Sequence, residues 1–160
     1  MNWRRCQAQD VSFVAAIFAQ ARAFMREQNL PQWQGEYPNA EDVRRDITQE
    51  IGWVLEDDEI LAYAAVRPGD EPTYGYIEGA WHSHAPYLTL HRVAVAQYGR
   101  GLVGQVFAHA AQMADWLRID THEQNAPMRR AIEKFGFEEC GIIYVEDGSP
   151  RIAYDKRTVE

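Results

Sequence analysis

A short turn with three glycines, Gly99-Arg100-Gly101-Leu102-Val103-Gly104, combines residue types that can bind an anion. It follows an apolar run with strand character and opens a segment whose apolar residues recur at helical spacing. The first turn of a helix has unpaired backbone N–H groups, and the helix dipole favours negative charge there. Glycine permits positive φ and close backbone approach, and Arg100 adds a positive charge. The pattern therefore predicts a phosphate-binding turn.

Two nucleotide-binding motifs can be compared with this turn. The chain contains no Gly-Lys-Ser/Thr, so a Walker-type loop is excluded. Residues 99–104 match the Gly-x-Gly-x-x-Gly dinucleotide pattern literally, but they fall late in the chain and no second βαβ unit follows them. A protein that binds NAD in preference to CoA therefore stays open as a further hypothesis.

The residues around the turn resemble the GNAT superfamily of acetyl-CoA-dependent N-acetyltransferases. The strand end Val93-Ala94-Val95 and the following turn are similar to the family's Val-x-Val strand and its Gln/Arg-x-x-Gly-x-Gly/Ala loop. Tyr98 and Val103 depart from that loop pattern, whereas Gly101 matches it. A second block, Asn125–Phe137, is similar to the family's Asn…Glu-Lys-x-Gly-Phe segment.

The resemblance implies acetyl-CoA as co-substrate, bound by the strand end, the turn and the downstream asparagine. The matching residues are Val93, Ala94, Val95, Arg100, Gly101, Leu102, Val103, Gly104 and Asn125. No metal is expected. The His-x-His in residues 81–84 has no cysteine or carboxylate at ligand spacing beside it.

Direct acetyl transfer to an amine needs a base for the ammonium and a proton donor for the departing thiolate. His91 is one candidate base, because period-two alternation puts it on the same strand face as Val93 and its ordinary pKa lies near neutrality. Some GNAT members that act on arylalkylamines look similar at this position. The alternative is a structural histidine that is hydrogen-bonded within the sheet.

Two further residues are catalytic candidates. Glu78, just upstream of the central strand, is a rival base, and its alternative role is a solvated loop carboxylate. The tyrosine that often serves as acid in the family is absent, because Ile132 stands seven residues after Asn125. Tyr144 is the candidate substitute, and its alternative role is a hairpin tyrosine packed on the sheet.

The aromatic loop NLPQWQGEYP, residues 29–38, is the candidate acceptor-binding segment. The corresponding loop usually covers the acceptor side in the family, so Gln32, Trp33 and Tyr37 could line an acceptor pocket. The alternative is that Trp33 anchors this loop in the core. The identity of the amine acceptor stays open.

Composition limits the classes of function. The chain has 160 residues, 46% of them hydrophobic, which predicts one globular domain over residues 1–160. A net charge of −8 argues against nucleic-acid binding. No segment approaches the roughly 20 apolar residues of a membrane span, and the N-terminus lacks the apolar core of a secretory signal. Cys6 and Cys140 have no paired spacing, so buried thiols in a reducing cytoplasm are expected.

Hydrophobic periodicity and turn residues predict an α+β fold, with one mixed and mostly antiparallel sheet of about six to seven strands and four helices. The GNAT resemblance implies the same order of elements. Capping residues are expected at Asp10 and at Asn39, the latter with Asp42 in a capping box. A short strand or turn is open at Tyr74–Glu78. The predicted strands are Asn2–Gln7, Gly52–Glu56, Ile60–Arg67, Tyr87–Val95, Leu117–His122, Glu139–Val145 and Arg151–Lys156, and the helices run from Asp10 to about Gln28, from Asn39 to about Glu50, from the glycine turn to about Asp115 and over Asn125–Phe135.

The combined prediction is an N-acetyltransferase that moves the acetyl group of acetyl-CoA to a primary amine of a small molecule or peptide, by direct attack in a ternary complex. The alternative is a non-catalytic acyl-CoA-binding regulatory module on the same fold, to which the missing tyrosine gives weight. The expected partners are acetyl-CoA and the amine acceptor, with no nucleic acid and no membrane. Dimers are common for the fold, so a homodimer is allowed and the oligomeric state stays open.

Overall fold

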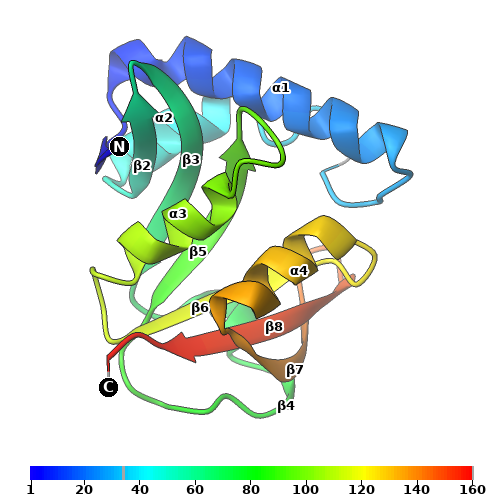
Figure 1. Ribbon diagram of the computed structural model, residues 1–160. Helices are drawn as coiled ribbons and strands as arrows, with labels where there is room; N and C mark the ends of the chain where they lie inside the picture. Colours follow the sequence, from blue (N-terminus) through cyan, green and yellow to red (C-terminus); the bar gives the residue numbers. More distant parts are fainter. Residues whose placement is uncertain (34, 160) are drawn as a thin grey trace. The chain divides into compact units, whose positions relative to one another are not determined.

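The computed structural model describes residues 1–33 and 35–159. Gln34, in the predicted acceptor loop, and Glu160, at the end of the predicted domain, lie outside the described residues. The described part contains four α-helices and eight strands, and all of them except β1 are labelled in Figure 1. In chain order they are β1 (Asn2–Arg5), α1 (Val11–Glu27), α2 (Ala40–Thr48), β2 (Gly52–Asp57), β3 (Glu59–Pro68), β4 (Glu78–Gly79), β5 (Leu88–Val95), α3 (Leu102–Ala110), β6 (Trp116–Thr121), α4 (Ala126–Phe135), β7 (Glu138–Tyr144) and β8 (Pro150–Arg157).

The strands of the described chain form one mixed sheet in the order β1-β2-β3-β5-β6-β8-β7-β4. β5 and β6 run parallel, with Leu88 opposite Leu117, and the β6–β8 and β7–β8 pairs are antiparallel. The predicted α+β fold with four helices is therefore confirmed. The sheet has eight strands instead of six to seven, because the two-residue strand β4 adds to the edge beside β7.

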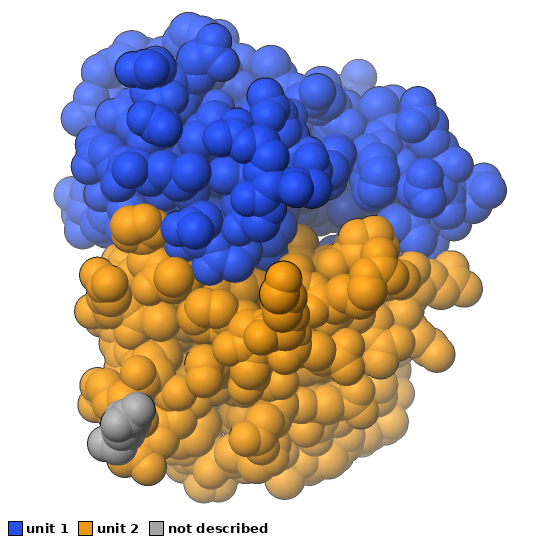
Figure 2. Space-filling model, in the orientation of Figure 1, with its two compact units in different colours: residues 1–66, 91–106 blue, residues 67–90, 107–160 orange. Residues whose placement is uncertain are grey.

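The chain divides into two compact units, coloured separately in Figure 2. The first unit comprises residues 1–66 and 91–106, and the second comprises residues 67–90 and 107–160. The prediction of a single domain over residues 1–160 is not tested by this division and stays a prediction.

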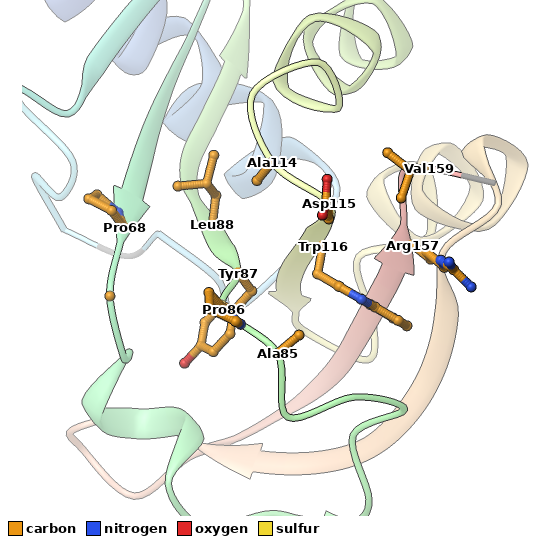
Figure 3. Close-up of a pocket in the computed structure, with 11 residues that line it drawn as sticks. Pro68, Ala85, Pro86, Tyr87, Leu88, Ala114, Asp115, Trp116, Arg157 and Val159 are labelled. Carbon is orange, nitrogen blue, oxygen red and sulfur yellow. The ribbon is translucent and has the colours of Figure 1, made fainter.

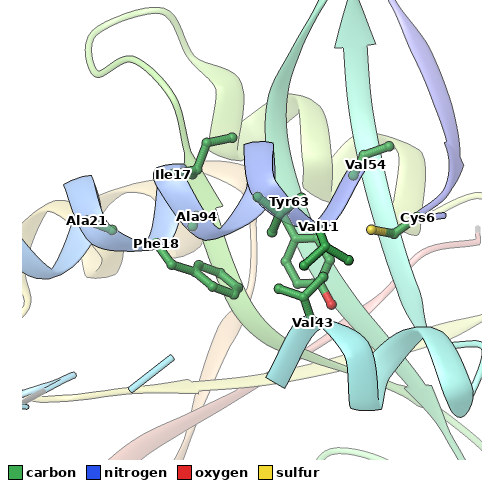
Figure 4. Packing of buried hydrophobic residues seen from close by; sticks show 10 residues of the cluster. Cys6, Val11, Ile17, Phe18, Ala21, Val43, Val54, Tyr63 and Ala94 are labelled. Atoms are coloured by element: carbon green, nitrogen blue, oxygen red, sulfur yellow. The ribbon is translucent and has the colours of Figure 1, made fainter. Parts of the chain in front are cut away.

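The core of the first unit is built from the apolar stripe of α1. Phe18 and Val14 are fully buried, and the Phe18 ring meets the Tyr63 ring edge-on at 5.3 Å between centroids. Burial of a side chain of this size contributes about 1.5–3 kcal/mol. Figure 4 shows side chains from α1, α2, β2 and β3 converging in this cluster. The apolar residues at helical spacing along α1 are all buried: Val11, Val14, Phe18, Ala21 and Met25.

The core of the second unit is rich in aromatic residues. The rings of Phe107, Phe135 and Phe137 contact one another with centroids 5.2–5.9 Å apart. Arg129 on α4 donates to the hydroxyl of Tyr154 on β8 at 3.2 Å, which holds this helix against the strand. The second unit therefore joins α4 to the β6-β8-β7-β4 part of the sheet.

Two facing glycines allow β4 to approach β7. Gly79 has φ +131° and Gly141 has φ +146°. A Cβ on Gly79 would lie 2.2 Å from the carbonyl oxygen of Cys140, and one on Gly141 would lie 2.1 Å from the carbonyl oxygen of Glu78. Only glycine fits at either position, so this contact fixes the path of the long segment between β3 and β5.

The helix ends agree with the sequence at some positions and differ at others. Asn39 caps α2 and forms the predicted capping box with Asp42, whose carboxylate accepts the Asn39 N–H at 2.9 Å. Asp10 is the N-cap residue of α1, as predicted, but its side chain does not cap the helix, because the carboxylate accepts from Arg4 and from the Gln7 N–H. α3 ends at Ala110 and not near Asp115, because the Met113 N–H bonds to the Ala110 carbonyl in a tighter turn.

Both cysteines are buried and free. None of the helices in the described chain has the length and apolar character that crossing a membrane requires.

Candidate functional site

The predicted anion-binding turn lies in the first unit, between the end of β5 and the start of α3. Gly99 and Gly101 adopt φ angles of +80° and +69°, in the left-handed region that favours glycine. The Ala96 N–H bonds to the Leu61 carbonyl at 2.8 Å, which ties the strand end to β3. The two glycines then turn the chain into α3.

Backbone N–H groups at the start of α3 face the same region. The helix begins at Leu102, and its Gln105 N–H bonds to the Gly101 carbonyl at 3.1 Å. The N–H groups of residues 102–104 lie before the first helical hydrogen bond, so no carbonyl group within the helix accepts a hydrogen bond from them. A Cβ built on Gly101 or Gly104 would meet open space, with no atom within 4 Å. The turn thus has both the N–H groups and the room that a phosphate group needs.

Side chains around the turn add charge and an aromatic face. Arg100 is exposed, and its Nη1 donates to Gln97 Oε1 at 3.0 Å. Tyr98, which departs from the family's Gln/Arg, stacks on Phe24 of α1 with ring centroids 4.3 Å apart. Tyr98 therefore packs the turn against α1, and the exposed Arg100 is the cationic side chain of the turn.

The strand before the turn contributes backbone groups and one histidine. Val93, Ala94 and Val95 are all buried, so their side chains belong to the core. Arg92 has φ +53°, which interrupts the extended conformation within β5. The period-two argument that put His91 on the same face as Val93 therefore fails across Arg92. His91 itself is half-buried on this strand.

Sequence reasoning missed the polar network around Arg92. Its Nε and Nη2 donate to the two oxygens of Asp46 on α2 at 2.9 and 2.7 Å, and its Nη1 donates to the Tyr37 hydroxyl at 3.3 Å. Tyr63 donates to Asp46 Oδ2 at 2.5 Å. A charged residue within an apolar strand, and an aspartate on the inner face of a helix, were the signals that could have revealed it.

Burial strengthens this network electrostatically. The Asp46 side chain is 3% exposed and that of Arg92 is 16% exposed. Burial alone would lower the pKa of Arg92, but the adjacent Asp46 carboxylate raises it above its ordinary value. Burial, with Asp46 as the second cause, also raises the pKa of Tyr63 well above its ordinary value. Arg92 is therefore charged and Tyr63 is a neutral donor at physiological pH.

The acceptor-loop candidates divide between core and surface. Trp33 is half-buried and meets the Phe18 ring edge-on at 6.0 Å, as the anchoring alternative predicts. Tyr37 is 45% exposed and bonded to Arg92. Gln32 is half-buried in the same loop. Tyr37 links this loop to β5 one residue away from His91.

The remaining candidates lie in the second unit. Asn125 caps α4, since its side chain accepts the Met128 N–H at 3.3 Å, and this accounts structurally for a buried asparagine. Tyr144 donates to Glu78 Oε1 at 2.9 Å, and this hydrogen bond is the main cause that raises the pKa of Tyr144. The Tyr144–Glu78 pair joins β7 to β4 at the edge of the sheet, where β7 is the second strand and β4 the third strand from β6. This contact favours a structural role for both residues.

A surface hollow in the second unit lies elsewhere. Figure 3 shows it beside the starts of β5 and β6, where Tyr87, Leu88, Trp116 and Arg157 are among the lining residues. None of the described residues that line it is a predicted site residue. The geometry that fits an anionic ligand is therefore the glycine turn of the first unit.

Comparisons with known proteins agree on one family. The family model described as "Acetyltransferase (GNAT) family" matches residues 18–137. A GNAT-family acetyltransferase from Streptococcus agalactiae 2603 has 33% sequence identity and a TM-score of 0.92, over 99% of this chain and 96% of that chain. A search of curated proteins found no match.

More distant structures share the fold. A GNAT-family acetyltransferase from Listeria monocytogenes 4b F2365 has 16% identity and a TM-score of 0.73, over 98% of this chain and 94% of that one. The yncA protein from Salmonella typhimurium, solved with its cofactor acetyl-CoA, has 14% identity and a TM-score of 0.66, over 99% and 94%.

Proposed function

Because this chain belongs to the GNAT acetyltransferase family, we propose that it moves the acetyl group of acetyl-CoA to a primary amine of a small molecule or peptide. The observation that carries the proposal is the glycine turn at the head of α3. There two residues with positive φ, three N–H groups that donate to no carbonyl within the helix and the exposed Arg100 follow one another along the chain, and a Cβ on Gly101 or Gly104 would meet open space. This is the chemistry of a pyrophosphate site.

The co-substrate would bind to this turn and to the preceding strand. The N–H groups of Leu102, Val103 and Gly104 would donate to pyrophosphate oxygens, with Arg100 as a charge partner. The backbone of Val93 and Val95 would pair with the pantetheine arm as an added strand would, which agrees with the burial of their side chains. Acetyl-CoA supplies the activated acetyl group, and its presence in the yncA structure supports this choice of ligand.

His91 is the proposed general base. It lies on β5 beside Arg92, whose bonds to Asp46 and Tyr37 fix the backbone at the break in the strand. A neutral imidazole there would accept a proton from the acceptor ammonium, directly or through water, and leave the amine free to attack the thioester carbonyl. Tyr37, with Gln32 and Trp33, would form the acceptor side of the site.

The cysteines support direct transfer without a covalent enzyme intermediate. Burial raises the pKa of the Cys6 thiol to about 12, and burial with Asp155 raises that of Cys140 to about 12 as well. Thiolate is the nucleophilic form, so neither residue is activated for acyl transfer. Asn125 as a pantetheine contact, and Glu78 and Tyr144 as catalytic groups, stay predictions, as do a cytoplasmic location and the absence of nucleic-acid partners.

Thiol release from acetyl-CoA with a panel of primary amines tests the proposal. The wild-type protein should release CoA with at least one amine. His91→Ala should lower kcat by about 100-fold or more and leave acetyl-CoA affinity within about twofold. His84→Ala, an exposed histidine of the second unit, is the matched control. If acetyl-CoA binds but no amine in a broad panel causes thiol release, the non-catalytic acyl-CoA-binding module is the better description.

A further inference from the structure

A cluster of metal-ligand side chains lies in the second unit, outside the proposed acetyl-transfer site. His82, Cys140 and Asp155 each offer a ligand atom, and these atoms all lie within 4.8 Å of one another. The three residues come from three segments: the linker between β3 and β5, strand β7 and strand β8. The His-x-His of residues 81–84 led us to expect no metal, because the other two ligand side chains are far along the chain: Cys140 lies 58 positions from His82 and Asp155 lies 73.

Backbone contacts hold the cluster together. The close approach of Gly79 and Gly141 is followed by a hydrogen bond from the Ala80 N–H to the Cys140 carbonyl at 3.0 Å. The His82 N–H then donates to Asp155 Oδ2 at 2.8 Å. The linker is thus fixed at two points before the histidine side chain is placed, so the juxtaposition does not depend on one flexible rotamer.

One of the two distances from His82 Nδ1 fits a tetrahedral zinc site, and the other would have to widen. Zinc bonds of about 2.0–2.1 Å to nitrogen and about 2.3 Å to sulfur place those two atoms about 3.5 Å apart. His82 Nδ1 and Cys140 Sγ are 3.4 Å apart. Nδ1 and Asp155 Oδ1 are 2.7 Å apart, a hydrogen-bond distance that would have to widen to about 3.4 Å in a zinc complex. The His82 side chain is 44% exposed, so it is the less tightly packed partner of the pair.

Charge and chemical type favour the same ion. The Asp155 side chain is 2% exposed, and both of its oxygens contact His82. Zinc would displace the proton of the Cys140 thiol, which is released to solvent on binding. The resulting thiolate and the Asp155 carboxylate would together balance the charge of Zn²⁺, whereas buried charges without compensation are costly. Thiolate and imidazole ligands favour zinc over magnesium or calcium. Glu138 Oε2 lies 3.5 Å from His82 Nε2, where a carboxylate orients the second ring nitrogen of a metal-bound histidine.

We propose that His82 Nδ1, Cys140 Sγ and Asp155 Oδ1 bind a zinc ion, with water in the fourth position. The ion would fasten the linker to β7 and β8. That linker also carries Trp81, whose ring covers the Arg118 guanidinium at 3.9 Å. Zinc binding therefore stabilises the second unit and is independent of the acetyl-transfer site in the first unit.

Titration of the chelator-treated full-length protein with zinc and cobalt chlorides tests this site. Calorimetry should give one zinc ion per chain, and Co²⁺ should produce a thiolate-to-cobalt charge-transfer absorption band. His82→Ala should weaken zinc binding by more than about tenfold, since it removes a ligand and not only an orienting group. Cys140→Ser should abolish the absorption band. His84→Ala, which removes an exposed histidine two residues away, should change neither measurement.

The expected result also includes a zinc-dependent rise in Tm for the wild-type protein that His82→Ala lacks. Absence of zinc binding to the wild-type protein would overturn the proposal, and so would unchanged affinity in His82→Ala. Persistence of the cobalt band in Cys140→Ser would do the same. If Cys140→Ser does not fold, the exposed His82 position still decides the question.

Discussion

Replacement of Arg92 by methionine tests whether the Arg92–Asp46 pair organises the site in the first unit. The change removes the guanidinium but retains an unbranched apolar stem of similar length. It leaves the 3%-exposed Asp46 carboxylate with the Tyr63 hydroxyl as its remaining donor in the Arg92–Asp46–Tyr63 network. Removal of one partner from a buried ion pair costs about 3–5 kcal/mol, because the other charge is left without compensation.

Urea unfolding followed by circular dichroism measures this loss. With a slope of about 2 kcal/mol per molar urea, a loss of 3–5 kcal/mol moves the midpoint down by about 1.5–2.5 M. The variant Arg92→Met/Asp46→Leu/Tyr63→Phe removes the buried Arg92–Asp46–Tyr63 network and leaves no buried charge, and the Tyr37 hydroxyl that loses Arg92 belongs to an exposed residue. It should recover most of the loss, to within about 2 kcal/mol of the wild-type protein.

Two results would refute this reasoning. A loss below about 1 kcal/mol in Arg92→Met would mean that Asp46 is better solvated than its burial indicates. A triple variant as unstable as the single variant would mean that Arg92 acts through packing, or through the strand break at φ +53°, and not through compensation of the aspartate. Lysine at position 92 is a useful intermediate, because it keeps the charge but loses the two-pronged contact.

Three further predictions concern charge and ionisation. Arg100→Glu should raise the Kd for acetyl-CoA by about 30-fold at low salt, because the change alters the charge near the phosphates by two units at about 1 kcal/mol each. The same change at exposed Arg44 should have little effect on the Kd, and equal effects of the two variants in calorimetry would contradict the proposed phosphate site. Cys6 in the folded protein should react with iodoacetamide at pH 8 at least about 100-fold more slowly than in urea, because burial raises its pKa to about 12. Rapid labelling of the folded protein, measured by peptide mass spectrometry, would contradict this expectation. The hydrogen bond from Arg4 lowers the pKa of Asp10 in the folded protein. The stabilisation from this pair is therefore complete above the ordinary Asp pKa of 3.8 and is lost as the pH falls through the lower folded-state pKa. Arg4→Met should flatten the acid side of the curve of unfolding free energy against pH, and an unchanged curve would refute the coupling.

The parts of the fold that the sequence predicted are those set by local chemistry. The buried stripe of α1 follows from helical spacing, and the capping box at Asn39 depends on contacts within three residues. The glycine turn was predictable because few residues other than glycine adopt the positive φ angles found at Gly99 and Gly101, so the glycines in the sequence marked the turn.

The parts that the sequence did not predict depend on distant contacts. Asp10 was expected to cap a helix, but its carboxylate bonds to Arg4 because β1 brings that guanidinium within 2.8 Å. A charged residue within an apolar strand marks Arg92, but its partner Asp46 lies 46 positions away and cannot be assigned from local sequence. The cluster of His82, Cys140 and Asp155 likewise depends on the packing of β4 on β7.

Calorimetric titration of the purified protein with acetyl-CoA, and in parallel with NAD, tests the central claim most directly. We expect micromolar binding of acetyl-CoA and no binding of NAD. Gly104→Asp, which puts a carboxylate into the open space at the helix start, should abolish acetyl-CoA binding, while Gly104→Ala should fold normally and serve as its neutral control. Absence of acetyl-CoA binding to the wild-type protein, or preference for NAD, would contradict the assignment of the glycine turn as an acetyl-CoA phosphate site.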